Sequence, residues 1–278
     1  MPKFDAQHYL PVESYKEALE TFHAVSAMIL FEFARQEQEI RDSILCNFVA
    51  RTDMMMKAIF HLWDMQDYQD CWILYRCLMD RFFHLSHLHE HNQFEVFEKW
   101  SFLEQYNSIN KVRSDPWCEG AHKSKRFNFT LEQKKRAKAL SKNPTSWQRP
   151  KAEEVAKRLD MRFLYDFGYD YASMHVHPMA NDGLQDFFTI TKLEPSPDFP
   201  EQRSVLSNTI VVGVMIVQEG LNASTPSWRA IVYDFLEYLL EFVNTGDTDY
   251  MISFLKLSKL FQEKVPFCEK SQSNPPRK

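Results

Sequence analysis

The stretch 71-CWILYRCLMDRFFHLSHLHEH-91 decides the fold, because its first half is apolar on nearly every side of a helix. A helix that is apolar all round is buried among other helices, so this segment is predicted to lie at the centre of the protein. Its ionisable side chains recur at steps of three and four residues, which places them on one face. This first polar stripe consists of Arg76, Asp80, His84, His87 and His91.

A second polar stripe runs through 163-FLYDFGYDYASMHVHP-178, for which we predict a helix over about residues 161–176. The residue before a proline disfavours the helical conformation, so this helix should end at Pro178. The stripe consists of Asp166, Asp170, Ser173 and His177. Ionisable groups in such apolar surroundings are costly unless they are paired or used. If the two stripes face each other they form a site, with Arg76 paired to Asp80 and both near His177.

The composition favours an all-α multi-helix bundle. Hydrophobic residues make up 44% of the 278 residues, and only 6 are glycine, fewer than turn-rich β folds need. Apolar residues recur at helical spacing along most of the chain. We therefore predict one large helical domain over residues 1–265 and a disordered tail over 266–278. Its main helices are expected near 15–36, 37–65, 69–90, 94–111, 161–176, 201–224, 227–242 and 249–263.

The cysteines and the N-terminal sequence indicate a cytoplasmic protein. The five cysteines form no CxxC pair and their number is odd, which argues against a disulfide framework and structural zinc. The N-terminus has no apolar signal core, and charges interrupt the long apolar stretches, so neither secretion nor membrane insertion is expected.

Charge is distributed unevenly, although the net formal charge is only -5. Residues 111–158 carry 14 Lys+Arg against 5 Asp+Glu, while the rest of the chain carries 19 against 33. Within this region, residues 114–150 read as a basic insertion or lid that holds a short helix, LEQKKRAKAL. Such asymmetry is typical of a nucleic-acid contact, and a solvated connector is the alternative. The candidate nucleic-acid-binding residues are Lys134, Lys135, Arg136 and Lys138.

The histidine cluster after residue 83 suggests metal binding only weakly. Several imidazoles could share one face, but no carboxylate motif such as HExxH accompanies them, so we expect neither a metal nor another cofactor. Arg76 and Asp80 are either a shielded anion-binding pair or a surface salt bridge. Ser173 lies mid-helix without flanking glycines, which argues against a serine nucleophile and favours a hydrogen bond to His177 or to a ligand.

At these stripes the chain resembles a large bacterial helical family known as a domain of unknown function. Members carry an LxRxLxE-like helix followed by a YxxLSxxxHP-like helix. Here these read LYRCLMDR (74–81), with Asp80 in place of the Glu, and YDYASMHVHP (169–178). The resemblance covers about residues 68–181. It implies an all-α fold and one pocket that gathers Arg76, Asp80, Ser173 and His177.

The helical layout and the R-x(5)-H spacing from Arg81 to His87 also resemble the HEPN superfamily. Many of its members are metal-independent ribonucleases of toxin and antiviral phage-defence systems, often active as dimers. The resemblance implies RNA cleavage by attack of a 2′-hydroxyl, with His87 or His177 as general base and Arg76 or Arg81 stabilising the phosphorane. RNA, a second copy and another protein are the expected partners. The alternative is a non-enzymatic helical module that binds a protein or small ligand.

Overall fold

The computed structural model describes residues 9–35, 39–118, 128–177, 179–180, 183–193, 202–226 and 228–264. Regular structure in these residues is entirely helical, which confirms the all-α prediction. No disulfide links the described cysteines to one another, and Cys268 lies outside the described residues, as does the predicted tail.

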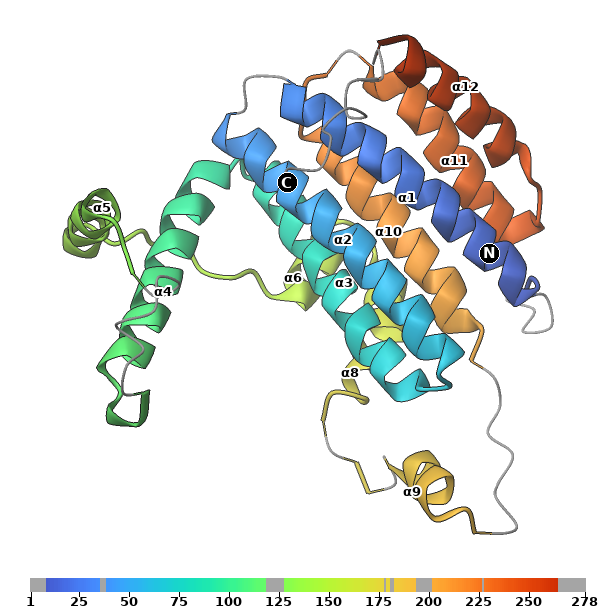
Figure 1. Cartoon of the computed structure of the whole chain (residues 1–278), viewed down its shortest axis with the longest axis horizontal. Coiled ribbons are helices and arrows are strands. Elements are labelled where there is room, and N and C mark those ends of the chain that lie inside the picture. Colours follow the sequence, from blue (N-terminus) through green and yellow to red (C-terminus); the bar gives the residue numbers. More distant parts are fainter. Residues whose placement is uncertain are drawn as a thin grey trace, which may run out of the picture.

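Six long helices build one bundle (Figure 1). The inner helices are α1 (Val12–Arg35), α2 (Ile40–Asp64), α3 (Tyr68–Glu90) and α10 (Ser204–Asn222). α11 (Arg229–Thr245) and α12 (Asp249–Lys264) pack as a pair on the side of α1 and α10. α10 contacts α1, α2, α3 and α11, so it lies at the centre of the bundle.

α3 is a core helix, as its sequence predicts. Its start is fixed by Asp67, whose side chain accepts a hydrogen bond from the backbone N–H of Asp70 at 3.2 Å. Its fully buried residues include Cys71, Leu78 and Leu85, which are spaced by seven residues along one face. Burying one leucine side chain contributes about 1.5 to 3 kcal/mol, so this face supplies much of the bundle's stability.

α10 is helical in spite of its β-branched residues. Thr209 is buried, and its hydroxyl donates to the carbonyl of Val205 at 2.6 Å. Gly213 allows α2 to approach closely, because a Cβ there would overlap the side chain of Met56. α10 is also long and apolar enough to cross a membrane, as a buried core helix often is, and 61% of its apolar window is buried inside the protein.

The basic insertion lies at the periphery (Figure 1). α4 (Phe94–Ser114) leaves the bundle, the short 3-10 turn η1 (Pro116–Cys118) follows, and α5 (Leu131–Lys142) crosses α4. The predicted basic helix is thus confirmed, and it begins with a capping box between Thr130 and Gln133. Residues 119–127 lie outside the described residues.

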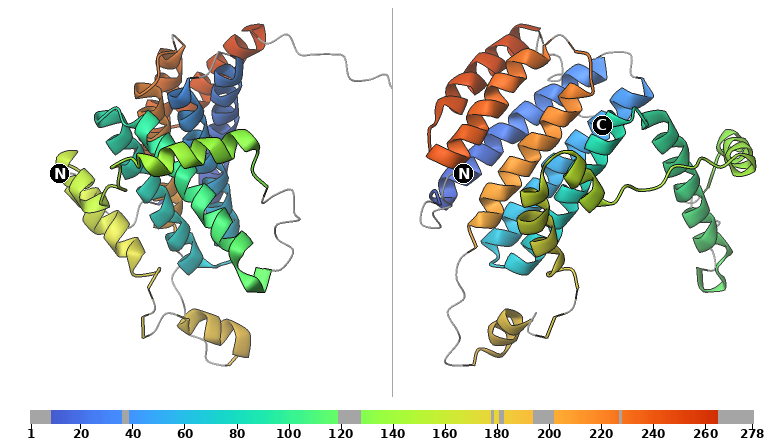
Figure 2. Two further views of the ribbon diagram at one scale, coloured as in Figure 1. Left: turned by 90° about the vertical axis from the view of Figure 1, so that its left-hand side faces the viewer. Right: turned by 180° about the vertical axis from the view of Figure 1, so that it is seen from behind.

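An irregular segment, residues 143–151, returns from α5 to the bundle, where α6 (Ala152–Arg158) packs on α3. The helix predicted over 161–176 is built from α7 (Arg162–Leu164), the π-helix η4 (Tyr165–Asp170) and α8 (Tyr171–Ser173). After it, α9 (Leu184–Thr191) stands clear of the bundle in both views of Figure 2.

Candidate functional site

The two polar stripes meet where η4 and α8 pack on α3. The guanidinium of Arg76 donates through Nε to the Ser173 hydroxyl at 3.0 Å, and through a second nitrogen to the carboxylate of Asp80. The same guanidinium lies over the ring of Tyr169, with 3.9 Å between its central carbon and the ring centroid. The predicted Arg76–Asp80 pair is therefore confirmed, whereas Ser173, which was predicted to bond His177 or a ligand, contacts Arg76 instead.

Tyr169 completes this group, which we call the Arg76 cluster (Arg76, Asp80, Tyr169 and Ser173). Its hydroxyl donates to Asp80 at 3.0 Å, and its backbone carbonyl accepts from Ser173 at 2.8 Å. Burial raises the pKa of Tyr169, and the nearby Asp80 carboxylate raises it further. The phenol therefore stays protonated at neutral pH and remains a hydrogen-bond donor. The members satisfy one another, so the cluster ties η4 and α8 to α3.

The π-helix changes which side chains of the second stripe face α3. Its hydrogen bonds run from residue i to i+5, so the register slips relative to an α-helix. Tyr169 faces Asp80, whereas Asp170 is exposed and Asp166 pairs with Arg162 at 2.9 Å. The sequence-based stripe thus placed Ser173 correctly and missed Tyr169.

The histidines after Ser173 lie in different surroundings. His177 is exposed beyond the end of α8, and no contact with the Arg76 cluster is found in the described part of the chain. His175 instead turns inward and stacks on Trp72, with 6.1 Å between ring centroids. Burial lowers the pKa of His175, so its ring is neutral at pH 7.

The histidines at the end of α3 make structural contacts, and the rings of His87 and His91 meet edge-on with 4.5 Å between their centroids. His87 lies 3.1 Å from a guanidinium nitrogen of Arg158, and burial, then His91 and Arg158, lower its pKa. His89 contacts the Glu219 carboxylate at 2.7 Å. Within the described ranges, no group of three or more His, Cys, Asp or Glu is arranged to hold a metal ion.

Arg81 lines a cavity of about 430 Å³ between α2, α3, α4 and residues 149–152, and His87 does not line it. Three arginines and several aromatic rings surround this cavity, which we call the arginine pocket. Its characteristic residues are Arg51, Arg81, Arg149, Phe48, His84, Phe97 and Trp100.

The arginine pocket has an excess of positive charge. Arg81 donates to the sulfur of Met55 at 3.2 Å, and among the residues described here no carboxylate pairs with Arg51, Arg81 or Arg149. Burial lowers the pKa of Arg81, and the nearby positive charge of Arg51 lowers it further. Asp80 is the one carboxylate among the described lining residues, and it is bound by Arg76.

His84 forms part of the aromatic wall of the pocket. Its ring stacks on Trp147 at 5.3 Å and meets Phe97 edge-on at 4.8 Å. Burial lowers the pKa of His84 to about 4, and Arg149 adds to this shift, so the ring is neutral at pH 7. Trp147 is itself buried, and it anchors the irregular segment that carries Arg149.

A second cavity, of about 640 Å³, adjoins the arginine pocket and shares Phe48, Arg81, Phe97 and Ser101 with it. Its two carboxylates are both paired, Glu39 with Arg41 at 3.7 Å and Glu98 with Arg136. The two cavities adjoin along α2 and α4 and Arg81 lines both, so we refer to them together as the groove.

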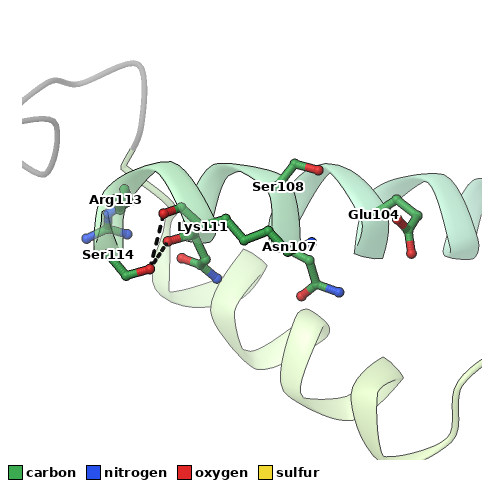
Figure 3. Close-up of a pocket in the computed structure, with 7 residues that line it drawn as sticks. Glu104, Asn107, Ser108, Lys111, Arg113 and Ser114 are labelled. Carbon is green, nitrogen blue, oxygen red and sulfur yellow. Dashed lines mark hydrogen bonds between the residues drawn. The ribbon is translucent and has the colours of Figure 1, made fainter. Parts of the chain in front are cut away.

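The candidate nucleic-acid-binding residues of α5 divide into two kinds. Arg136 pairs with Glu98 and lies 4.3 Å from the ring of Phe102, so it holds α5 against α4. Lys134, Lys135 and Lys138 are exposed. A further cavity of about 730 Å³ follows the C-terminal half of α4, where Glu104, Lys111 and Arg113 lie among short polar side chains (Figure 3).

One protein family matches this chain. The model of a family of unknown function, DUF5677, matches residues 42–192, which is more than half of the chain. The matched region contains α3, the Arg76 cluster and the arginine pocket. No curated protein and no solved structure matches the chain.

Proposed function

We propose that this chain, which belongs to the DUF5677 family, binds single-stranded RNA in the arginine pocket and along the groove that continues from it. One observation carries the proposal: Arg51, Arg81 and Arg149 converge on one cavity with no carboxylate partner among the described residues. Guanidinium groups bind phosphate through paired hydrogen bonds, and a phosphate would relieve the repulsion between them.

The aromatic rings of the arginine pocket favour a nucleic acid over a simple anion as its ligand. Phe97 and Trp100 line the pocket beside the arginines, and base stacking on such rings tolerates any sequence. The adjoining cavity extends the groove toward Phe102, where α5 and its exposed lysines begin. A flexible single strand can follow this path, with phosphates on the arginines and bases on the rings.

The HEPN resemblance extends the proposal from binding to metal-independent cleavage. In that reaction the ribose 2′-hydroxyl oxygen bonds to the adjacent phosphorus and loses its proton to a base. The bond from phosphorus to the 5′-oxygen then breaks, which leaves a cyclic 2′,3′-phosphate and a 5′-hydroxyl that takes up a proton. In this proposal Arg81, which lines the pocket, stabilises the phosphorane. His87 and His177 do not line the pocket, so binding is the part that the geometry supports best.

Binding is tested with a short fluorescein-labelled single-stranded RNA, whose anisotropy is measured over a range of salt concentrations. We expect Arg51→Gln and Arg149→Gln each to weaken binding about tenfold, because each removes one charged contact to phosphate. Asp80→Asn should tighten binding, since it removes the carboxylate of the pocket.

The matched control is Arg162→Gln, which removes an exposed arginine that pairs with Asp166 outside the pocket. It should bind RNA as the wild type does. Equal loss in all the arginine variants, or no binding by the wild type at low salt, would contradict the proposal.

Cleavage is tested separately by incubating the purified protein with total RNA, with and without EDTA. Products that form equally in both and carry cyclic phosphate ends support the ribonuclease. RNA that is bound but stays intact leaves a non-enzymatic binding module, which is the alternative function.

A further inference from the structure

A second aromatic cavity, of about 440 Å³, lies between α3, η4 and the start of α10. We call it the Tyr75 pocket, and none of the described residues that line it also lines the arginine pocket. Its walls include Trp72, Tyr171, Phe163 and Phe167, and the last two are 57% and 67% exposed at its rim. Pockets of this volume and apolar character bind small molecules.

Tyr75 is the most buried of the hydroxyl- and amide-bearing residues that line this pocket. The residue is only 1% exposed, and no hydrogen bond to its hydroxyl is found within the described chain. Burial raises the pKa of Tyr75, so the phenol keeps its proton and can donate it in a hydrogen bond. The hydroxyl of this almost wholly buried residue therefore keeps a free donor, which a ligand can satisfy.

Gly168, in the π-helix, helps to leave this hydroxyl uncovered. A Cβ at Gly168 would lie 3.1 Å from the Tyr75 hydroxyl oxygen, which is closer than ordinary packing allows. π-turns within helices often occur at functional sites. The local distortion and the unpartnered hydroxyl are therefore two separate observations at the same place.

We propose that the Tyr75 pocket binds an uncharged, mainly apolar small molecule whose carbonyl oxygen accepts a hydrogen bond from Tyr75. None of the described residues that line the pocket is Asp, Glu, Lys, Arg or His, so no charge is available to balance a charged ligand. Trp72 and Tyr171 pack edge-to-face with 5.0 Å between their ring centroids, so together they give a ligand an aromatic wall. Ser204 and Asn208, from the start of α10, supply further polar contacts.

The test uses two probes of equal size, 2-acetylnaphthalene, which has a carbonyl, and 2-isopropylnaphthalene, which lacks it. Their Kd values are measured by ligand-observed NMR on the full chain. We expect the wild type to prefer the acetyl probe about fivefold, as one hydrogen bond provides. Tyr75→Phe should remove this preference, leave binding of the isopropyl probe unchanged and not lower the melting temperature, because the lost hydroxyl has no protein partner in the described chain.

The matched control is Tyr15→Phe. Tyr15 is equally buried, but its hydroxyl accepts a hydrogen bond from the Leu10 backbone N–H at 3.2 Å and lies outside the pocket. This variant should lose stability and keep the preference for the acetyl probe. Arg51→Gln should bind both probes as the wild type does, so failure of the RNA proposal and failure of this one are distinguishable.

Three results would overturn the proposal. The first is that neither naphthalene binds, and the second is that the preference survives in Tyr75→Phe. The third is a wild-type dimer that Phe167→Asp dissociates, because the aromatic rim would then be an interface between two copies of the chain and not the mouth of a ligand site.

Discussion

Two arginines five residues apart on α3 have opposite roles. Arg76 is satisfied by Ser173, Asp80 and the ring of Tyr169, so it positions helices. Arg81 makes one contact to a sulfur and stacks loosely on a phenylalanine ring at 5.9 Å, so its guanidinium remains available to a ligand. The sequence singled out both residues, but only the spatial arrangement of their neighbours distinguishes them.

His84 should make the stability of the fold depend on pH. Its pKa is about 4 in the folded chain and near 6.5 when unfolded, so the unfolded chain binds the proton first as the pH falls. The stabilisation is fully present above about pH 6.5 and is lost as the pH falls toward 4. Between pH 7 and pH 5, the wild type should lose about 2 kcal/mol more unfolding free energy than His84→Phe does, as measured by urea denaturation.

The control for this comparison is His177→Gln. His177 is exposed, so this variant removes a histidine that lies outside the aromatic wall. If His84→Phe follows the pH dependence of the wild type, the aromatic wall of the arginine pocket does not hold a neutral imidazole.

At the scale of the element, periodicity predicted the helices because each buries one apolar face. The helices expected near 69–90 and 94–111 are found at 68–90 and 94–114. The π-turn in η4 was not predictable in this way, because its hydrogen bonds slip to bring Tyr169 onto Asp80, a contact with a helix almost 90 residues earlier. Gly168 inside an apolar helical segment was the local signal that could have indicated it.

The arginine pocket could not be predicted from the sequence, because its three arginines come from three separate segments of the chain. Arg51 lies on α2 and Arg81 on α3, whereas Arg149 lies on the irregular segment 143–151, whose sequence has no helical or strand periodicity. Trp147, two residues before Arg149 in this segment, packs against the rings of His84 and Trp100. The pocket therefore depends on long-range packing, which neither spacing nor composition encodes.

The central position of α3 gives a direct stability prediction. Leu78 is fully buried, so Leu78→Ala should reduce the unfolding free energy by about 2 to 5 kcal/mol, through lost burial and the cavity that remains. Urea denaturation followed by circular dichroism measures the loss. Leu131→Ala, at a residue that is 70% exposed on α5, is the control and should change stability by less than about 0.5 kcal/mol. Similar small losses in both variants would mean that α3 is not the core.

At the scale of the whole molecule, charge is separated in space as well as in sequence. The acidic part of the chain forms the bundle, and the basic helix α5 is carried away from it on α4 (Figure 1). An extended polyanion that enters the groove beside α4 would therefore meet further positive charge outside the bundle.

Neutralising the exposed lysines of α5 should weaken RNA binding without disturbing the fold. The triple variant Lys134→Gln, Lys135→Gln, Lys138→Gln leaves Arg136 to hold α5 on α4. If all three lysines contact phosphate, the slope of log Kd against log salt should flatten by about 2, because fewer counterions are released. Anisotropy at several salt concentrations measures the slope. An unchanged slope would show that α5 is a solvated connector.

α3 contributes to both proposed pockets, with Arg81 and His84 in one and Trp72 and Tyr75 in the other. A rigid helix cannot shift at one of these sites without moving the other. Thermodynamic linkage then sets a strict symmetry: whatever factor a neutral ligand applies to the affinity for RNA, RNA must apply to the affinity for that ligand. Each of two chemically unrelated ligands would thus change the affinity for the other through a single helix, although the two do not touch.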